Sequence, residues 1–206
     1  MPRPTSPVVR RALVERAAAL LARREPVTLR SLTAGTAVST MAVYTYFDGM
    51  PGLWQAVRQE GFTRLGERLA TVRSAADPVR NLAALGVAYV QHALANPDLY
   101  RVMFDSSFDL PDPAAAAAGF DPLVSATRAA QRAGRFDVDI DPSDVALRYW
   151  ASGHGLTSLA VTGVLPVRDL RRHAPATAVA IFVAAGDEPE LALRSVRAAW
   201  RGSGVG

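Results

Sequence analysis

The hydrophobic positions of this chain recur with the period of an α-helix along almost its whole length. In residues 8–24, Leu13, Ala17 and Leu20 follow one another at helical spacing, while the arginines lie off that stripe. Such spacing gives a helix one apolar face, and Pro26 ends the pattern. The sequence shows no alternating strand pattern. We therefore predict an all-α fold.

Nine to ten helices are expected. Thr28 suits the N-cap of a short second helix, and Ser39 suits the N-cap of a third helix that ends near Tyr46. Residues 105–121 are acidic and proline-rich before an alanine run, and we interpret them as a loop. The later helices are expected at about 51–72, 77–96, 100–104, 120–134, 142–163, 174–185 and 188–201.

The helix that opens with "DPSD" at residues 141–144 is apolar on nearly all sides. After Asp144 its only formal charge is Arg148, and small residues such as Gly153 and Gly155 are frequent. A helix of this kind must be covered on more than one face. We expect one face to pack inside the subunit and another to pack against a second copy, which predicts a homodimer.

Charge is distributed unevenly. Residues 1–75 hold eleven arginines and five acids, a balance of 11 − 5 = +6, whereas the remainder holds twelve arginines and fourteen acids, or −2. A positive first part favours a polyanionic partner; a solvated, arginine-rich helix surface is the alternative. The chain has no cysteine and no apolar run of about 20 residues. These features predict a soluble, cytoplasmic protein.

Residues 28–47 have the layout of a helix-turn-helix, with two short helices, a tight turn and hydroxyl residues at the start of the second helix. Val43 and Phe47, four residues apart, would face the core. Hydroxyl and methyl groups can read base edges while positive groups hold phosphates. A small helical hairpin with an exposed aromatic side chain is the alternative. The residues left free to meet DNA are Thr40, Met41, Ala42, Tyr44 and Thr45.

The segment "LVERAAALLARREPVTLRSLTAGTAVSTMAVYTYFDGMPGLWQAV", residues 13–57, resembles the N-terminal DNA-binding domain of the TetR/AcrR family of bacterial regulators. The turn that precedes the recognition helix, the aromatic residues at its end and the leucine of the following helix all match the family pattern. The resemblance implies a three-helix DNA-binding head at residues 1–50 and a ligand-binding and dimerisation body at residues 51–206.

The resemblance also implies which residues of the head contact DNA. Thr28 and Tyr46 would touch phosphates, and Tyr44 and Thr45 would enter the groove. Two positions depart from the family pattern, because Ala37 replaces the turn glycine and Met50 replaces a phosphate-binding lysine. Backbone amides at that helix start, or Arg10, Arg11 and Arg30, are possible substitutes. The full set of expected DNA-binding residues is Thr28, Arg30, Ser39, Thr40, Met41, Ala42, Tyr44, Thr45, Tyr46 and Met50.

A ligand pocket is expected in the body. Trp150, His154 and Thr157 fall on one helix face at i, i+4 and i+7. Together with aromatic and apolar residues of earlier segments they could form an apolar pocket with a few polar groups; each of them could equally be a core residue. The full expected set is Tyr89, His92, Met103, Phe104, Phe108, Trp150, His154 and Thr157.

The stretch "YWASGHGLTSL" is similar to a TetR C-terminal subtype marked by Trp, His and Gly, here Trp150, His154 and Gly155. The resemblance implies a helical ligand pocket and a dimer formed by the C-terminal helices. No metal site is expected, because the three histidines include no close pair and "DVDID" at 137–141 lacks the glycine and glutamate of a calcium loop. Nor does the chain contain a phosphate-binding glycine loop or a nucleophile elbow.

The sequence is therefore interpreted as a homodimeric, ligand-responsive transcriptional regulator without a cofactor. In this family such a protein is most often a repressor of a palindromic operator. Two alternatives belong to other classes: a helical enzyme that uses His154 as a base, and a helical scaffold that does not bind DNA.

Overall fold

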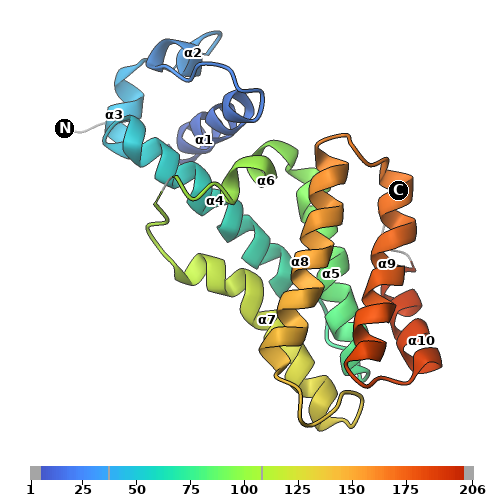
Figure 1. Cartoon of the computed structure of the whole chain (residues 1–206). Coiled ribbons are helices and arrows are strands. Elements are labelled where there is room, and N and C mark those ends of the chain that lie inside the picture. The colour runs from blue at the N-terminus through green and yellow to red at the C-terminus, as the bar shows by residue number, and fades with distance from the viewer. Residues whose placement is uncertain (1–5, 37, 108, 202–206) are drawn as a thin grey trace. The chain divides into compact units, whose positions relative to one another are not determined.

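The computed structural model describes residues 6–36, 38–107 and 109–201, and within these residues it contains ten α-helices and no strand (Figure 1). The predicted all-α fold is confirmed. None of the helices within the described residues is long and apolar enough to cross a membrane. The helices are α1 (Pro7–Ala22), α2 (Leu29–Thr33), α3 (Met41–Phe47), α4 (Met50–Ala70), α5 (Pro78–Ala95), α6 (Pro97–Met103), α7 (Ala114–Arg132), α8 (Pro142–Val161), α9 (Val167–Ala184) and α10 (Pro189–Trp200).

Contacts divide the chain into two compact units. The first comprises Met1–Arg64 and Asn96–Ala115, and the second comprises Leu65–Ala95 and Ala116–Gly206. The predicted head boundary at residue 50 falls inside the first unit, because this unit also includes the N-terminal part of α4 and because α6 packs against α1. Whether residues 1–50 act as the functional head stays a prediction.

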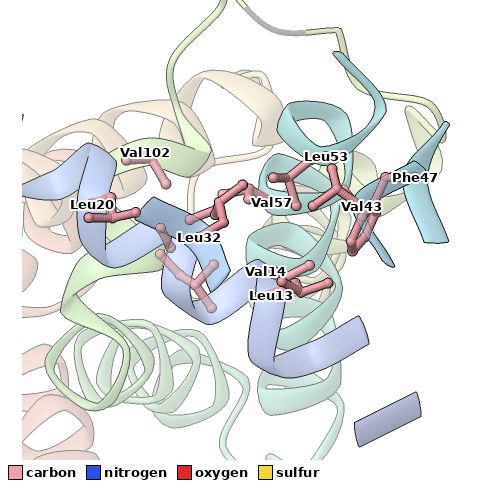
Figure 2. Packing of buried hydrophobic residues seen from close by; sticks show 13 residues of the cluster. Leu13, Val14, Leu20, Leu32, Val43, Phe47, Leu53, Val57 and Val102 are labelled. Atoms are coloured by element: carbon pink, nitrogen blue, oxygen red, sulfur yellow. The ribbon is translucent and has the colours of Figure 1, made fainter. Parts of the chain in front are cut away.

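The first unit has an apolar core built by α1, α2, α3, α6 and the start of α4. Leu20, Leu32 and Leu53 are at most 2% exposed (Figure 2). Val43 and Phe47 belong to the same core, as the i, i+4 spacing predicts. Burial of these two side chains fixes which face of α3 points outward.

The starts of α7 and α9 differ most from the sequence prediction. Helix α7 begins at Ala114 rather than near residue 120, because alanine has the highest helix propensity and the Asp112 carboxylate accepts a hydrogen bond from the Ala114 amide at 3.0 Å. Helix α9 begins at Val167 rather than 174 and contains Pro175 in its interior. The alanine run is therefore helix, and the predicted 105–121 loop ends before it.

The second unit holds α5 and α7–α10, with α5 against α8 and α10, and α9 against α8 and α10. An ion-pair cluster ties its loops together. The Arg135 guanidinium donates to Asp187 at 2.6 and 2.7 Å and to Asp77 at 3.1 Å. The Ser195 hydroxyl donates to Asp77 at 2.5 Å. This cluster joins the start of α5 to the segment after α7 and to α10.

Candidate nucleic-acid interface and ligand pocket

Helix α2 starts with a reciprocal cap. The Thr28 hydroxyl accepts from the Ser31 amide at 3.0 Å, and the Ser31 hydroxyl accepts from the Thr28 amide at 2.9 Å. Thr28 is thus the N-cap that the sequence predicts. The turn after α2 contains Gly35 with φ of 72°, a left-handed conformation that glycine adopts without strain. Ala37, which replaces the turn glycine of the family pattern, lies outside the described residues.

The start of α3 differs from prediction. Thr40, not Ser39, is the flanking residue, and no side chain caps the helix. Thr40 already has helical dihedral angles, with φ of −58° and ψ of −28°, and the Ser39 carbonyl accepts from the Ala42 amide at 3.0 Å. The first turn is therefore closed by backbone bonds. Ser39 and Thr40 are both exposed, and neither hydroxyl has a partner among the described residues.

The outward face of α3 is uncharged. Met41 is 65% exposed and Tyr44 is 53% exposed, which is unusual for large apolar side chains. Thr45 is exposed, but its hydroxyl donates to the Met41 carbonyl at 3.0 Å. Ala42 is only partly exposed and packs against the core of the first unit. The residues that α3 presents to a partner are therefore Met41, Tyr44 and the methyl group of Thr45.

Tyr46 is half-buried, and its hydroxyl accepts a hydrogen bond from the Ser6 amide at 2.7 Å. Within the described residues no acceptor takes the phenol proton, which could therefore be donated to a phosphate oxygen. Met50 begins α4 with its side chain packed on the core, so at this position only the backbone is suited to hold a phosphate.

Backbone contact fixes α3 against α4. A Cβ atom added to Gly52 would lie 1.8 Å from the Phe47 carbonyl oxygen. The connection also contains two left-handed residues, Asp48 with φ of 56° and Gly49 with φ of 102°. The absence of a side chain at position 52 is therefore required for the observed placement of α3.

Many arginines of the first unit are engaged by acids. Glu15 accepts from Arg11 at 3.1 Å and from Arg64 at 3.0 Å, and Arg64 also pairs with Glu60 at 2.8 Å. Burial raises the pKa of Glu15, but hydrogen bonds and charge from Arg11 and Arg64 outweigh it and the pKa lies below its usual value. Arg30 is exposed and has no ion pair among the described residues. Arg10 lies over the Phe47 ring, 5.5 Å from its centre, with Glu60 at 4.0 Å.

The second unit contains a small cavity enclosed by side chains of α4, α5, α7, α8, α9 and α10. Its volume is about 30 Å³, which is room for about two water molecules. None of the lining residues carries a formal charge. They are Leu69, Leu85, Gly86, Tyr89, Val90, Gly119, Leu123, Tyr149, Trp150, Gly153, Leu156, Ala174, Thr177, Ala178 and Trp200.

The cavity gathers some of the predicted ligand residues. Tyr89 and Trp150 line it. His154 lies behind them, with Nδ1 2.7 Å from the Tyr89 hydroxyl and its ring 5.5 Å from that of Trp150. Burial lowers the pKa of His154. A neutral imidazole with its proton on Nε2 can accept from Tyr89, so His154 is suited to position the tyrosine.

Other predicted ligand residues lie elsewhere. Thr157 is fully buried and donates to the Gly153 carbonyl at 2.7 Å, and His92 is buried without lining the cavity. Met103 and Phe104 belong to the first unit, where Phe104 meets the edge of Phe62 at 5.5 Å. Phe108 lies outside the described residues.

Comparison with known proteins identifies the architecture. Residues 82–182 match the family model of the tetracyclin repressor-like C-terminal domain. The chain is similar to a protein of unknown function from Rhodococcus sp. RHA1, at 26% identity over 98% of both chains with a TM-score of 0.64. It is also similar to a regulatory protein of the TetR family from Rhodococcus RHA1, at 20% identity over 93% of this chain and 98% of that one, with a TM-score of 0.68. The chain has the fold of the TetR-family regulators.

A third solved structure with this fold is RolR in complex with the ligand resorcinol, at 21% identity over 92% of this chain and 93% of that chain, with a TM-score of 0.58. No curated protein matches the chain. The TetR C-terminal match spans α5 to α9, which supply most of the cavity wall. The Trp/His/Gly subtype stays a prediction.

Sequence reasoning did not select Trp200 or Tyr149 for the pocket. Trp200 ends the apolar stripe of α10, and Tyr149 directly precedes Trp150. Tyr149 is fixed by a close approach of α5 and α8, because a Cβ atom on Gly86 would lie 2.0 Å from its hydroxyl. In the sequence, the only sign of this close approach is the glycine at position 86. Without the fold, that glycine does not reveal which side chain packs against it.

Proposed function

We propose that this protein is a ligand-responsive transcriptional regulator that binds double-stranded DNA through α3. The observation that carries the proposal is the outward face of α3, on which Met41 and Tyr44 are exposed while Val43 and Phe47 anchor the helix in the core. These two side chains lie one helical turn apart on a seven-residue helix, and neighbouring exposed apolar groups of this kind suit a binding surface. The TetR fold supports DNA as that partner.

The groups around α3 suit different parts of a duplex. Met41, Tyr44 and the Thr45 methyl group would contact base edges and thymine methyl groups in the major groove. Thr28, Arg30 and Tyr46 would hold phosphates, together with the hydroxyls of Ser39 and Thr40 and the backbone amides at Met50. Ala42 would make the closest backbone approach.

A homodimer is proposed from the surface of α8. Its exposed residues include a stripe at four-residue spacing, with Leu147 49% exposed and Leu159 44% exposed. Ala151 and Gly155 lie between them, and a Cβ atom on Gly155 would meet nothing within 4 Å. Small residues flanked by leucines allow a second helix to pack closely. A two-fold dimer presents two α3 helices, which matches a palindromic operator.

Repression relieved by a small apolar molecule is the mode that these features support best. Helix α4 contributes Leu53 to the core of the first unit and Leu69 to the cavity of the second. A molecule larger than about two waters must displace the cavity walls, and Leu69 belongs to the same helix whose first turn contacts α3. Ligand entry would thus favour a conformation that binds the operator less tightly.

The DNA assignment can be tested by selecting binding fragments from random-sequence DNA and measuring their affinity for Tyr44→Ala. Loss of the exposed ring should weaken the selected site by at least about tenfold without changing thermal stability. Val138→Ala, at another exposed apolar residue in the second unit, is the matched control and should bind normally. Equal affinity of Tyr44→Ala and wild type would refute the role of α3.

The dimer assignment needs its own measurement. Leu159→Arg places a charge in the α8 stripe and should shift the protein from dimer to monomer in sedimentation velocity. Val138→Arg adds the same charge at an exposed position outside α8 and should remain dimeric. A dimer that persists in Leu159→Arg contradicts this interface.

A further inference from the structure

One residue that lines the cavity of the second unit, Trp200, carries a buried hydrogen-bond donor without a partner among the described residues. The Nε1 atom of Trp200 is buried and has no acceptor there. Two of the lining hydroxyls are engaged, because Tyr89 bonds His154 at 2.7 Å and Tyr149 donates to the Ala83 carbonyl at 3.4 Å. The Trp200 indole N–H is therefore a buried donor of a lining residue that is open to an acceptor from a ligand.

The described surroundings of Trp200 are apolar and supply no acceptor. The indole packs against an apolar cluster that includes Val90, Leu170 and Ala174, with Leu156 beside it. A buried N–H without a partner costs about 1–3 kcal/mol, and most buried donors in native proteins are paired. An oxygen atom brought in by a ligand would remove that cost.

The charge of the lining decides between classes of acceptor. A carboxylate would need a positive partner to offset its loss of hydration, and no residue that lines the cavity carries a formal charge. A neutral carbonyl oxygen needs only one donor, and the rest of the lining is suited to an apolar body. We propose that the effector of this pocket is a neutral, apolar carbonyl compound whose oxygen accepts a hydrogen bond from Trp200 Nε1. This inference rests on the proposed ligand-responsive function.

The full-length protein allows a direct test, because its three tryptophans give only three indole N–H signals in a ¹⁵N-labelled sample. Trp200→Phe identifies the signal of Trp200 and keeps an aromatic ring without the donor. The probes are size-matched pairs, benzaldehyde with toluene and acetophenone with ethylbenzene, together with benzoate. The Trp200 indole proton should move downfield with the carbonyl compounds and not with the hydrocarbons.

Affinity gives the second readout. The preference of wild type for acetophenone over ethylbenzene should fall about five- to tenfold in Trp200→Phe, the loss of one neutral hydrogen bond. Three outcomes would overturn the proposal: a downfield shift of the Trp200 signal with the hydrocarbons, tighter binding of benzoate than of benzaldehyde, or no shift of that signal with any probe. Each of these readings is measured on the wild-type protein, and in them the variant serves only to assign the Trp200 signal.

The same wild-type sample is also used in the DNA selection. DNA binding without carbonyl binding refutes this inference alone. Carbonyl binding without DNA binding refutes the proposed regulator and leaves the pocket chemistry intact.

Discussion

Replacement of Gly52 by alanine should disable the DNA-binding surface through the backbone. The added Cβ atom would lie 1.8 Å from the Phe47 carbonyl oxygen, whereas such contacts essentially never fall below 3.0 Å. The end of α3 and the first turn of α4 must therefore separate by at least 3.0 − 1.8 = 1.2 Å. Overpacking of this kind costs about 1–3 kcal/mol. A shift of this size also exceeds the range of distances that a hydrogen bond tolerates.

The assay combines chemical denaturation with titration of the selected DNA site. Gly52→Ala should lower the free energy of unfolding by about 1–3 kcal/mol and weaken DNA binding by more than about tenfold. Gly66→Ala is the matched control, because it lies in the same helix and its Cβ would be 3.3 Å from that of Ala118, a contact that a small shift relieves. If Gly52→Ala binds DNA as tightly as wild type, α3 is not held by this contact and the argument fails.

Three further predictions concern the second unit. Arg135→Met should lower the free energy of unfolding by about 3–5 kcal/mol, because the buried Asp187 loses the guanidinium partner that lies 2.6 Å away. A loss below about 1 kcal/mol, measured by urea titration, would contradict a structural role of this ion pair. Burial raises the pKa of Asp77, but the Ser195 hydroxyl, two backbone amides and Arg135 together bring it below its usual value. The stabilisation of the fold by the ionised Asp77 is thus present above the unfolded-state pKa and is lost as pH falls through the folded-state pKa. The stability of Asp77→Asn should therefore depend less on pH below about 4 than that of the wild type. Parallel curves of stability against pH for the two proteins would refute this. Burial lowers the pKa of His154, so the stability of the fold should fall as pH drops from about 6.5 towards the folded-state pKa. In thermal melts at different pH values, His154→Gln should lack this fall in stability. An unchanged pH profile in the variant argues against a neutral, buried imidazole.

Much of the fold could be predicted from short-range patterns in the sequence. Thr28 and Asp141 are N-caps in the structure because capping depends on residues two or three positions away, as the bond from the Ser143 amide to Asp141 at 2.8 Å shows. The core positions of α3 could be read from i, i+4 spacing for the same reason. Pro175 shows the limit of local rules, since it lies inside α9 although proline disfavours a helix interior.

The pocket depends on contacts that no local pattern encodes. Trp200 packs against side chains of α5 and α9 that lie far from it in sequence, and only the packed fold reveals that its N–H has no acceptor among the described residues. Thr157 illustrates the opposite case. Helical spacing placed it on one face with Trp150 and His154, but its hydroxyl bonds the Gly153 carbonyl instead of lining the cavity. A shared helix face therefore does not establish a shared site.

The first unit has fewer arginines free to contact DNA than its net positive charge suggests, because several of them are paired with acids. Arg11 and Arg64 share Glu15, whose lowered pKa keeps it ionised, and these charges largely cancel. Arg16, Arg24 and Arg30 have no acid partner among the described residues, and the Arg16 Nε atom donates to the Ser31 carbonyl at 3.4 Å, which places it beside α2. Because each phosphate contact adds about −0.9 to the salt slope, these three arginines would contribute only about −3 per subunit. With so little non-specific attraction, tight binding would have to come from the uncharged face of α3, and the protein would discriminate among DNA sequences more strongly than its basic composition suggests.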